Sequence, residues 1–313
     1  MKYKHLFGPV PSRRLGISLG VDLVPAKICS QNCIYCEVGE TTELTMTRKE
    51  YISLESMCGE LDNFLVTNPE LDYITFSGSG EPTLNSRMGE LTLYLKKHYP
   101  QYKLACITNS SLLWDTKLRE ELVLVDILLP SLDAVSEEVF QKLNRPQAEL
   151  TASMIVEGLI EFRKMYRGEI WLEIFLSPGL NDTEPELAKL KQACAEIKAE
   201  KIQLNTLDRP GIERGLRAVS RQRLEEIVKY FQPLPIEIIA NARIRKQRKS
   251  YSDEISNRLL ELISRRPCTD QDLCQILGLH INELNKYLSS LLASGQIREV
   301  EGERGIFFEI RSH

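Results

Sequence analysis

Three cysteines stand within eight residues near the start of the chain: Cys29, Cys33 and Cys36, with three and then two residues between them. Thiolates are soft ligands that select zinc, copper(I) or iron–sulfur clusters. A structural zinc site usually has a fourth ligand at a regular offset, but the next cysteine here is Cys58, inside a stretch with helical apolar spacing. Three thiolates can instead hold three corners of a cubane [4Fe–4S] cluster and leave the fourth iron open to a small molecule. We therefore interpret this stretch as an iron–sulfur site that performs chemistry.

A glycine-rich turn with an acid follows the β-rich run that begins at Asp72. It reads Gly78-Ser79-Gly80-Glu81-Pro82. Glycine allows the backbone to approach a ligand closely. Barrel enzymes place their chemistry at the C-terminal ends of parallel strands. We expect this turn to lie against the same ligand as the cysteines.

The cysteine spacing, with Tyr35 directly before the third cysteine, resembles the signature of the radical S-adenosylmethionine (radical SAM) superfamily. The turn at residues 78–82 resembles the glycine-rich motif of that family, with Ser79 where glycine is common. The resemblance implies a [4Fe–4S] cluster whose open iron is chelated by S-adenosylmethionine, and an external electron donor of the flavodoxin or ferredoxin type. One electron would cleave the sulfonium bond and yield a 5′-deoxyadenosyl radical. It also implies that Tyr35, Ser79, Gly80 and Glu81 contact the cofactor.

Short β-rich runs alternate with helical patterns along the first 240 residues, which predicts parallel strands joined by crossover helices. The expected strands lie in the second half of residues 7–25 and near residues 72–77, 103–110, 122–133, 169–177 and 201–209. The expected helices lie near residues 54–65, 115–122, 151–166, 184–200 and 220–231. Six such units predict an α/β fold, a partial (β/α)6 TIM-like barrel over residues 1–240.

Polar residues follow several of these strands, and barrel enzymes carry their chemistry on that rim. By resemblance, Asn109, Ser131 and Asp133 match positions that bind the ribose hydroxyls and the methionine carboxylate. Asn205 and Arg209 would face the adenosine or the substrate. With the three cysteines, Arg209 is a candidate catalytic residue. Asn181 and Asp182, after the fifth strand, are expected to cap the next helix.

Arg13 and Arg14 precede the first strand and are either a surface or strand-edge pair or an anion clamp, because guanidinium binds carboxylate or phosphate in a bidentate fork. The other five cysteines are expected to be small buried hydrophobes.

No run approaches the roughly 18 apolar residues of a membrane span, and the N-terminus lacks the apolar core of a signal peptide. We therefore expect a cytoplasmic protein without a membrane partner. The formal charge of −4 argues against a protein that coats nucleic acid.

Residues 241–251 form a basic linker, with five cations and no acid between Arg243 and Lys249. This run is either a solvated linker or an arm that contacts phosphates. Residues 252–313 predict three helices and a hairpin, with Thr269-Asp-Gln-Asp as a capping box, and resemble a winged helix-turn-helix domain. The third helix offers only Lys286 as a cation, and residues 251–313 carry seven lysines and arginines against ten acids. Docking of protein or contact with RNA is therefore favoured over sequence-specific DNA reading.

The sequence predicts a radical SAM enzyme that acts on a macromolecule, either RNA or a protein or peptide. Residues 7–16 and 76–84 look most similar to a branch related to the tRNA 4-demethylwyosine synthases. Those synthases carry a second cluster on cysteines upstream of the triad, whereas this chain has no cysteine before Cys29. The alternative is a redox-responsive regulator that holds a cluster and binds nucleic acid through its winged helix.

Overall fold

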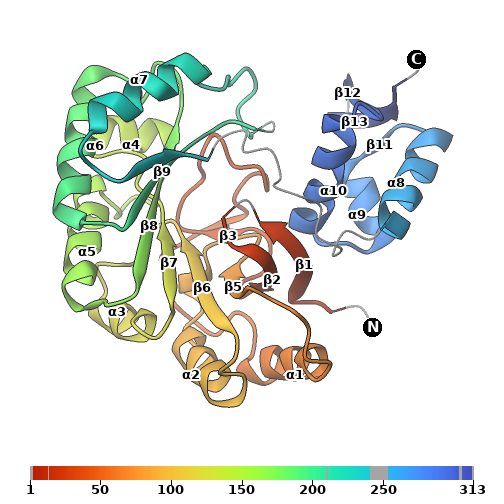
Figure 1. Ribbon diagram of the computed structural model, residues 1–313, viewed down its shortest axis with the longest axis horizontal. Coiled ribbons are helices and arrows are strands. Elements are labelled where there is room, and N and C mark those ends of the chain that lie inside the picture. The colour runs from red at the N-terminus through yellow and green to blue at the C-terminus, as the bar shows by residue number, and fades with distance from the viewer. Residues whose placement is uncertain (1–2, 13, 209–210, 240–252, 303–304, 312–313) are drawn as a thin grey trace.

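The computed structural model describes residues 3–12, 14–208, 211–239, 253–302 and 305–311. Its main feature is an eight-stranded sheet in the order β1-β2-β5-β6-β7-β8-β9-β10 (Figure 1). The strands are β1 (Leu6–Ser12), β2 (Gly16–Asp22), β5 (Tyr73–Ser77), β6 (Lys103–Thr108), β7 (Ile127–Pro130), β8 (Glu169–Leu176), β9 (Lys201–Thr206) and β10 (Ile236–Ile238). Strand β1 is antiparallel to β2, and every other pairing is parallel. The parallel strands therefore end at one common edge.

Helices connect these strands and cover the outer face of the sheet (Figure 1). They are α1 (Leu54–Leu65), α2 (Met88–His98), α3 (Thr116–Leu122), α4 (Glu137–Leu143), α5 (Ala152–Met165), α6 (Glu184–Ile197) and α7 (Arg221–Phe231). A short 3-10 helix, η1 (Pro82–Leu84), follows β5, and a small pair, β3 (Ile28–Cys29) and β4 (Glu43–Leu44), lies beside the sheet. The predicted α/β class is confirmed. We interpret the open sheet, with β1 and β10 as its edges among the described strands, as the predicted partial barrel.

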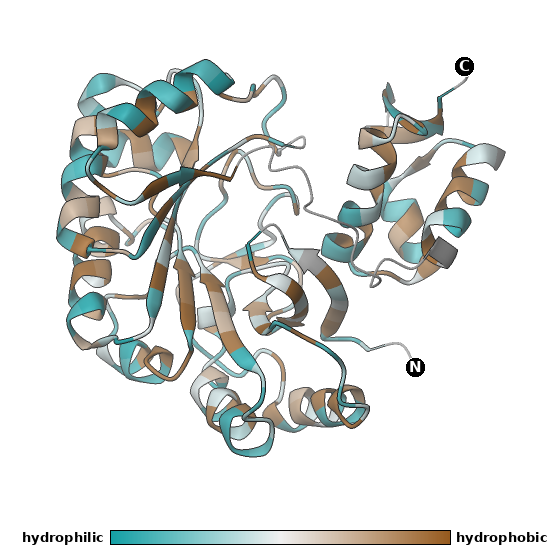
Figure 2. Cartoon of the chain, in the orientation of Figure 1, coloured by the Kyte–Doolittle hydropathy of each residue, from teal (hydrophilic) through white to brown (hydrophobic). Residues whose placement is uncertain are grey.

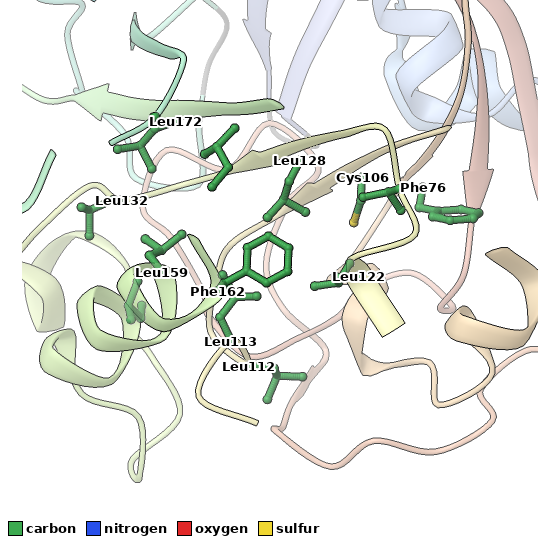
Figure 3. Packing of buried hydrophobic residues seen from close by; sticks show 14 of the residues in the cluster. Phe76, Cys106, Leu112, Leu113, Leu122, Leu128, Leu132, Leu159, Phe162 and Leu172 are labelled. Carbon is green, nitrogen blue, oxygen red and sulfur yellow. The ribbon is translucent and has the colours of Figure 1, made fainter. Parts of the chain in front are cut away.

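The core lies between the sheet and these helices. The ribbon of the strands is mostly coloured hydrophobic, and the helices around the sheet carry both hydrophobic and hydrophilic residues (Figure 2). Leu159 and Phe162 lie three residues apart on α5, so both point at the sheet, where they pack near Leu128 and Leu172 (Figure 3). All four are fully buried. Each such side chain stabilises the fold by about 1.5–3 kcal/mol, which holds the strand ends in place.

Residues 253–311 form a second unit with its own buried cluster, which includes Leu259, Leu284 and Leu288. Its elements are α8 (Asp253–Arg265), β11 (Cys268–Thr269), α9 (Asp270–Leu277), α10 (Ile281–Ala293), β12 (Ile297–Gly302) and β13 (Gly305–Ile310). The capping box at Thr269 is confirmed. The winged-helix assignment and the boundaries 1–240, 241–251 and 252–313 stay predictions, and the basic run lies outside the described residues.

Within the described residues, no helix is both long and apolar enough to cross a membrane. Of the five cysteines outside the triad, Cys106, Cys194 and Cys268 are buried as expected, whereas Cys58 and Cys274 are partly exposed.

Two helical glycines give a test of the packing with opposite expected signs. A Cβ on Gly158 in α5 would lie 2.8 Å from backbone atoms of Leu113 and Trp114, which cannot move without shifting the chain, whereas nothing lies within 4 Å of a Cβ on Gly59 in α1. Alanine exceeds glycine in helix propensity by about 1 kcal/mol. Gly59→Ala should therefore raise the free energy of unfolding in urea by about 0.5–1 kcal/mol, and Gly158→Ala should lower it. Stabilisation by both substitutions would contradict this packing.

Candidate functional site

A cavity of about 400 Å³ lies at the C-terminal ends of the parallel strands. Ten of the twelve residues that the sequence predicts as site residues line it. They are Cys29, Cys33, Tyr35, Cys36, Ser79, Gly80, Glu81, Asn109, Ser131 and Asn205. Asp133 lies just behind the wall, and Arg209 falls outside the described residues. The strand ends thus gather residues from five separate parts of the chain around one space.

The three cysteine sulfurs each receive a nitrogen donor from elsewhere in the fold. Lys27 Nζ donates to Cys36 Sγ at 2.6 Å and to the Gly39 carbonyl at 2.9 Å. The side-chain amide of Asn109 lies 3.5 Å from Cys29 Sγ, and that of Asn144 lies 3.4 Å from Cys33 Sγ. Hydrogen bonds to sulfur are among the contacts by which proteins tune iron–sulfur clusters, so this donor set fits such a cluster.

The thiols lie in a low-dielectric setting. Burial, and after it the negative charge of Glu81, raises the pKa of Cys29 to about 11. Burial, and after it the negative charge of Asp133, raises the pKa of Cys33 still further. All eight cysteines are free thiols. Among the described residues, no three Cys, His, Asp or Glu side chains gather tightly enough to hold a single metal ion.

The glycine-rich turn lies against the strand that carries Cys29. A Cβ on Gly80 would lie 2.0 Å from the carbonyl oxygen of Ile28, and one on Gly78, at φ +137°, would lie 2.2 Å from the Asp22 carboxylate. The Ser79 N–H and hydroxyl donate to that same carboxylate at 3.2 and 3.0 Å. Glycine is therefore required on both sides of Ser79, because only a bare backbone fits between the cysteine strand and Asp22.

Glu81 is buried, and both of its carboxylate oxygens accept hydrogen bonds. Oε1 accepts from the Thr83 N–H and hydroxyl and from the Thr108 hydroxyl, and Oε2 accepts from the Asn109 N–H at 2.7 Å. Although burial raises its pKa, these donors oppose that effect. The carboxylate fastens the turn to the end of β6, so Asn109 is held facing Ser30 and Cys29.

Asp133 joins three segments below the cavity wall. It accepts hydrogen bonds from the Tyr35 hydroxyl, the Asn144 side-chain amide and the Phe175 N–H. The Tyr35 ring stacks on Phe175, with ring centroids 3.8 Å apart. Burial raises the pKa of Asp133 to about 6. Through these contacts, Asp133 and Tyr35 hold the cysteine loop against β8.

Arg14 and Glu173 form an ion pair inside the cavity, and Asn205 Nδ2 lies 3.4 Å from Glu173 Oε1. Both charged side chains are largely buried, at 14% and 17% exposed. Arg14 lies between β1 and β2 and lines the cavity, where it pairs with a carboxylate of the protein itself, and Arg13 falls outside the described residues. Lys27, Asn144 and Glu173 are not among the site residues predicted from the sequence. Only Lys27, two residues before Cys29, offered a signal by its position.

Comparison with known proteins identifies the family. The profile of the radical SAM superfamily matches residues 23–190. A UPF0026 protein of Methanocaldococcus jannaschii, MJ1312, is 30% identical over 310 residues, which cover 96% of this chain and 94% of that protein. A UPF0026 protein of Helicobacter pylori strain 26695 is 33% identical over 295 residues, or 93% of each chain. The chain belongs to the radical SAM superfamily and, through relatives that it matches over nine tenths of both lengths, to the UPF0026 proteins.

One relative is much longer than this chain. A protein named GTPase Obg from Brachyspira hyodysenteriae is 35% identical over 304 residues, which cover 96% of this chain and 44% of that protein. The present sequence contains no Gly-x4-Gly-Lys-Ser/Thr segment, the phosphate-binding loop of many GTPases. The GTPase name is therefore not carried over to this chain.

Solved structures agree on the fold. A radical SAM methyltransferase from Sphaerobacter thermophilus superposes with a TM-score of 0.55 at 15% identity, covering 72% of this chain and 67% of that one. SuiB of Streptococcus suis bound to S-adenosylmethionine gives 0.52 at 12% identity, covering 70% and 50%. At these identities the likeness concerns the fold alone. With the family shown, the protein is a radical SAM enzyme, and its cofactors are a [4Fe–4S] cluster and S-adenosylmethionine.

The raised pKa of Asp133 predicts a pH dependence of stability in the metal-free protein. The group ionises near pH 6 when folded and near its ordinary 3.8 when unfolded, so the folded state retains the proton longer. Its contribution to stability is complete below pH 4 and is lost as the pH rises through 6, by about 3 kcal/mol for a shift of about two units. Urea unfolding at pH 4, 5, 6 and 7 should show the free-energy difference between wild type and Asp133→Asn shrinking by that amount. A difference that is constant with pH would contradict this account.

Proposed function

We propose that Cys29, Cys33 and Cys36 bind three irons of the cluster and leave the fourth iron to S-adenosylmethionine held on the turn at residues 78–81. The observation that carries this proposal is that three thiols with nitrogen donors and a turn of bare backbone face one cavity. When bound, the cluster and S-adenosylmethionine supply an electron and a 5′-deoxyadenosyl radical. The chain's own task is to orient the cofactor and keep water from it.

Of the remaining site residues, some would contact the cofactor and others would hold those residues in position. Backbone groups of Ser79 and Gly80 would bind the amino group of the cofactor. Asn109, Ser131 and Asn205, which line the cavity, would contact its ribose, carboxylate or adenosine. Glu81 and Asp133, whose carboxylates bind the protein's own donors, would position these groups. Arg209 and the flavodoxin- or ferredoxin-type electron donor remain part of the proposal on the sequence resemblance alone.

The substrate class that the site favours is a polypeptide. The Arg14–Glu173 pair presents both signs of charge inside the cavity, which suits an amide backbone or a zwitterionic group better than a chain of phosphates. The whole sequence is acidic, at −4, whereas phosphate binding relies on a surplus of cations. Among the structural neighbours, SuiB is solved with a precursor peptide, at 12% identity and a TM-score of 0.52. RNA is the competing substrate.

Removal of the cysteines tests the cluster. In protein reconstituted without oxygen, Cys29→Ala, Cys33→Ala and Cys36→Ala should each lose the brown chromophore and most bound iron, and none should release 5′-deoxyadenosine from S-adenosylmethionine on reduction. Cys58→Ala is the matched control, because this partly exposed thiol on α1 is not among the residues that line the cavity. Wild-type protein that holds a cluster but releases no 5′-deoxyadenosine would contradict the enzyme and favour the redox-responsive regulator.

Mass profiling of peptides and nucleosides tests the substrate class. Cells lacking the gene should lose a modified polypeptide that returns with the wild-type gene and not with the Cys33→Ala variant. A change confined to RNA nucleosides would overturn the polypeptide substrate and leave the radical chemistry standing.

A further inference from the structure

Helix α10 of the C-terminal unit meets the barrel at β1, close to the active-site cavity (Figure 1). His280, the residue that caps α10, supplies the central contact. Its Nδ1 accepts the N–H of Asn282 at 3.1 Å, so its proton is on Nε2. Nε2 lies 2.8 Å from Asp22 Oδ2 and 3.0 Å from the Ser79 hydroxyl. Because Nε2 carries the proton, it donates to the Asp22 carboxylate.

A stacked ring supports this contact from the barrel side. The Phe7 ring lies parallel to the His280 ring, with centroids 4.4 Å apart and planes 12° apart. A Cβ on Gly20 would lie 2.0 Å from the Phe7 ring, so the ring sits flat on bare backbone of β2. One helical turn into α10, Glu283 accepts the N–H of Gly8 at 3.5 Å. The first turn of α10 therefore rests on a surface that β1 and β2 build together.

Asp22 connects this interface with the cofactor turn. Its carboxylate accepts from Ser79 N–H and hydroxyl as well as from His280. Ser79 is the residue of the turn that is held between two close-packed glycines. A single buried carboxylate thus binds both the C-terminal unit and the turn proposed to hold S-adenosylmethionine, and a shift of either partner changes the hydrogen bonds of the other.

The same face of α10 reaches the cavity. Asn282 and Lys286 are four residues apart, so they share one side of the helix, and both line the cavity. Asn282, Glu283 and Lys286 of this helix thus all lie at the barrel. The C-terminal unit therefore supplies part of the wall around the site.

We propose that α10 is a built-in wall of the active site, and that His280, as a positioning residue, couples docking of the C-terminal unit to binding of S-adenosylmethionine through Asp22 and Ser79. This inference rests on the proposed function of the turn. Coupling of two binding events is reciprocal. Docking holds the turn in its binding conformation, and the bound cofactor in return holds α10 on the barrel. The bound cofactor would therefore keep α10 in place as part of the cavity wall.

The test uses the full chain with its cluster reconstituted without oxygen. His280→Asn is the main variant, because asparagine is a good helix cap but is too short to reach Asp22, and His280→Ala is the second. Arg298→Ala is the control, since it removes an exposed ion pair with Glu309 on the β12–β13 hairpin of the same unit. Two quantities are measured: the Kd for S-adenosylmethionine by equilibrium dialysis, and hydrogen exchange of the α10 amides with and without the cofactor.

We expect S-adenosylmethionine to slow exchange in the first turn of α10 of wild type and of Arg298→Ala. Both His280 variants should bind it about tenfold more weakly, within the usual range of coupling, and should show fast exchange there with or without it. Wild-type Kd in both variants, or α10 exchange that the cofactor leaves unchanged in wild type, would overturn the coupling. If wild type itself fails to bind the cofactor, the proposed function fails. Exchange without cofactor then still decides whether His280 docks α10, and equal exchange in wild type and variants would overturn that contact.

Discussion

The site depends on buried carboxylates that bind the protein's own donors. Glu81 accepts four hydrogen bonds from Thr83, Thr108 and Asn109, and without them a carboxylate at 2% exposure would be costly. These bonds fix the glycine-rich turn to the end of β6. Asp22 and Asp133 do the same for the turn and for the cysteine loop. Loops at strand ends are otherwise mobile, so these carboxylates give the cavity a defined shape.

This arrangement separates two tasks that a carboxylate can perform near a metal cluster. The carboxylates of Glu81, Asp22 and Asp133 bind the protein's own donors and so support the structure, while the thiols, amides and bare backbone face the cavity together with the Arg14–Glu173 ion pair. Lys27 brings a positive charge to the cysteines themselves, since its ammonium group lies 2.6 Å from Cys36 Sγ. The Lys27 ammonium group and the side-chain amides of Asn109 and Asn144 each contact a different cysteine sulfur, and such donors favour the negative charge of thiolates that bind iron.

The sequence was informative where a function uses consecutive residues. The cysteine triad and the turn at residues 78–81 could be found because their members are neighbours in the chain. By contrast, Asn144 meets Cys33 from 111 residues away and Glu173 meets Arg14 from 159 residues away, and such pairings arise only when the sheet forms. His280 reaches Asp22 across 258 residues. A single sequence carries no signal for contacts of this kind.

The helices and strands show the same difference between what the local sequence indicates and what it does not. The apolar run at residues 122–133 fits a helix or a strand. In the structure its start ends α3, and only Ile127–Pro130 forms β7. Strand β1 was missed because Gly8, Pro9 and Pro11 indicate a turn, whereas proline is tolerated at a sheet edge. Helix α4 is too short for a clear period. Helix α2 was not predicted, although Leu91 and Leu95 stand at helical spacing and bury one face of it. Asn181 and Asp182 were expected to cap α6, but Thr183 occupies the N-cap position, without a side-chain capping bond. Asn181 instead binds the backbone of Ser177, Asp133 and Phe175.

The central claim is that the cysteine triad leaves one iron open beside the turn at residues 78–81. Electron paramagnetic resonance of the reduced, reconstituted protein tests it most directly, recorded before and after S-adenosylmethionine is added. The account predicts a [4Fe–4S] signal whose g-values shift when the cofactor binds, because its amino and carboxylate groups occupy the open iron. A cluster spectrum that does not change at saturating cofactor, or protein that holds zinc at the triad, would contradict the account.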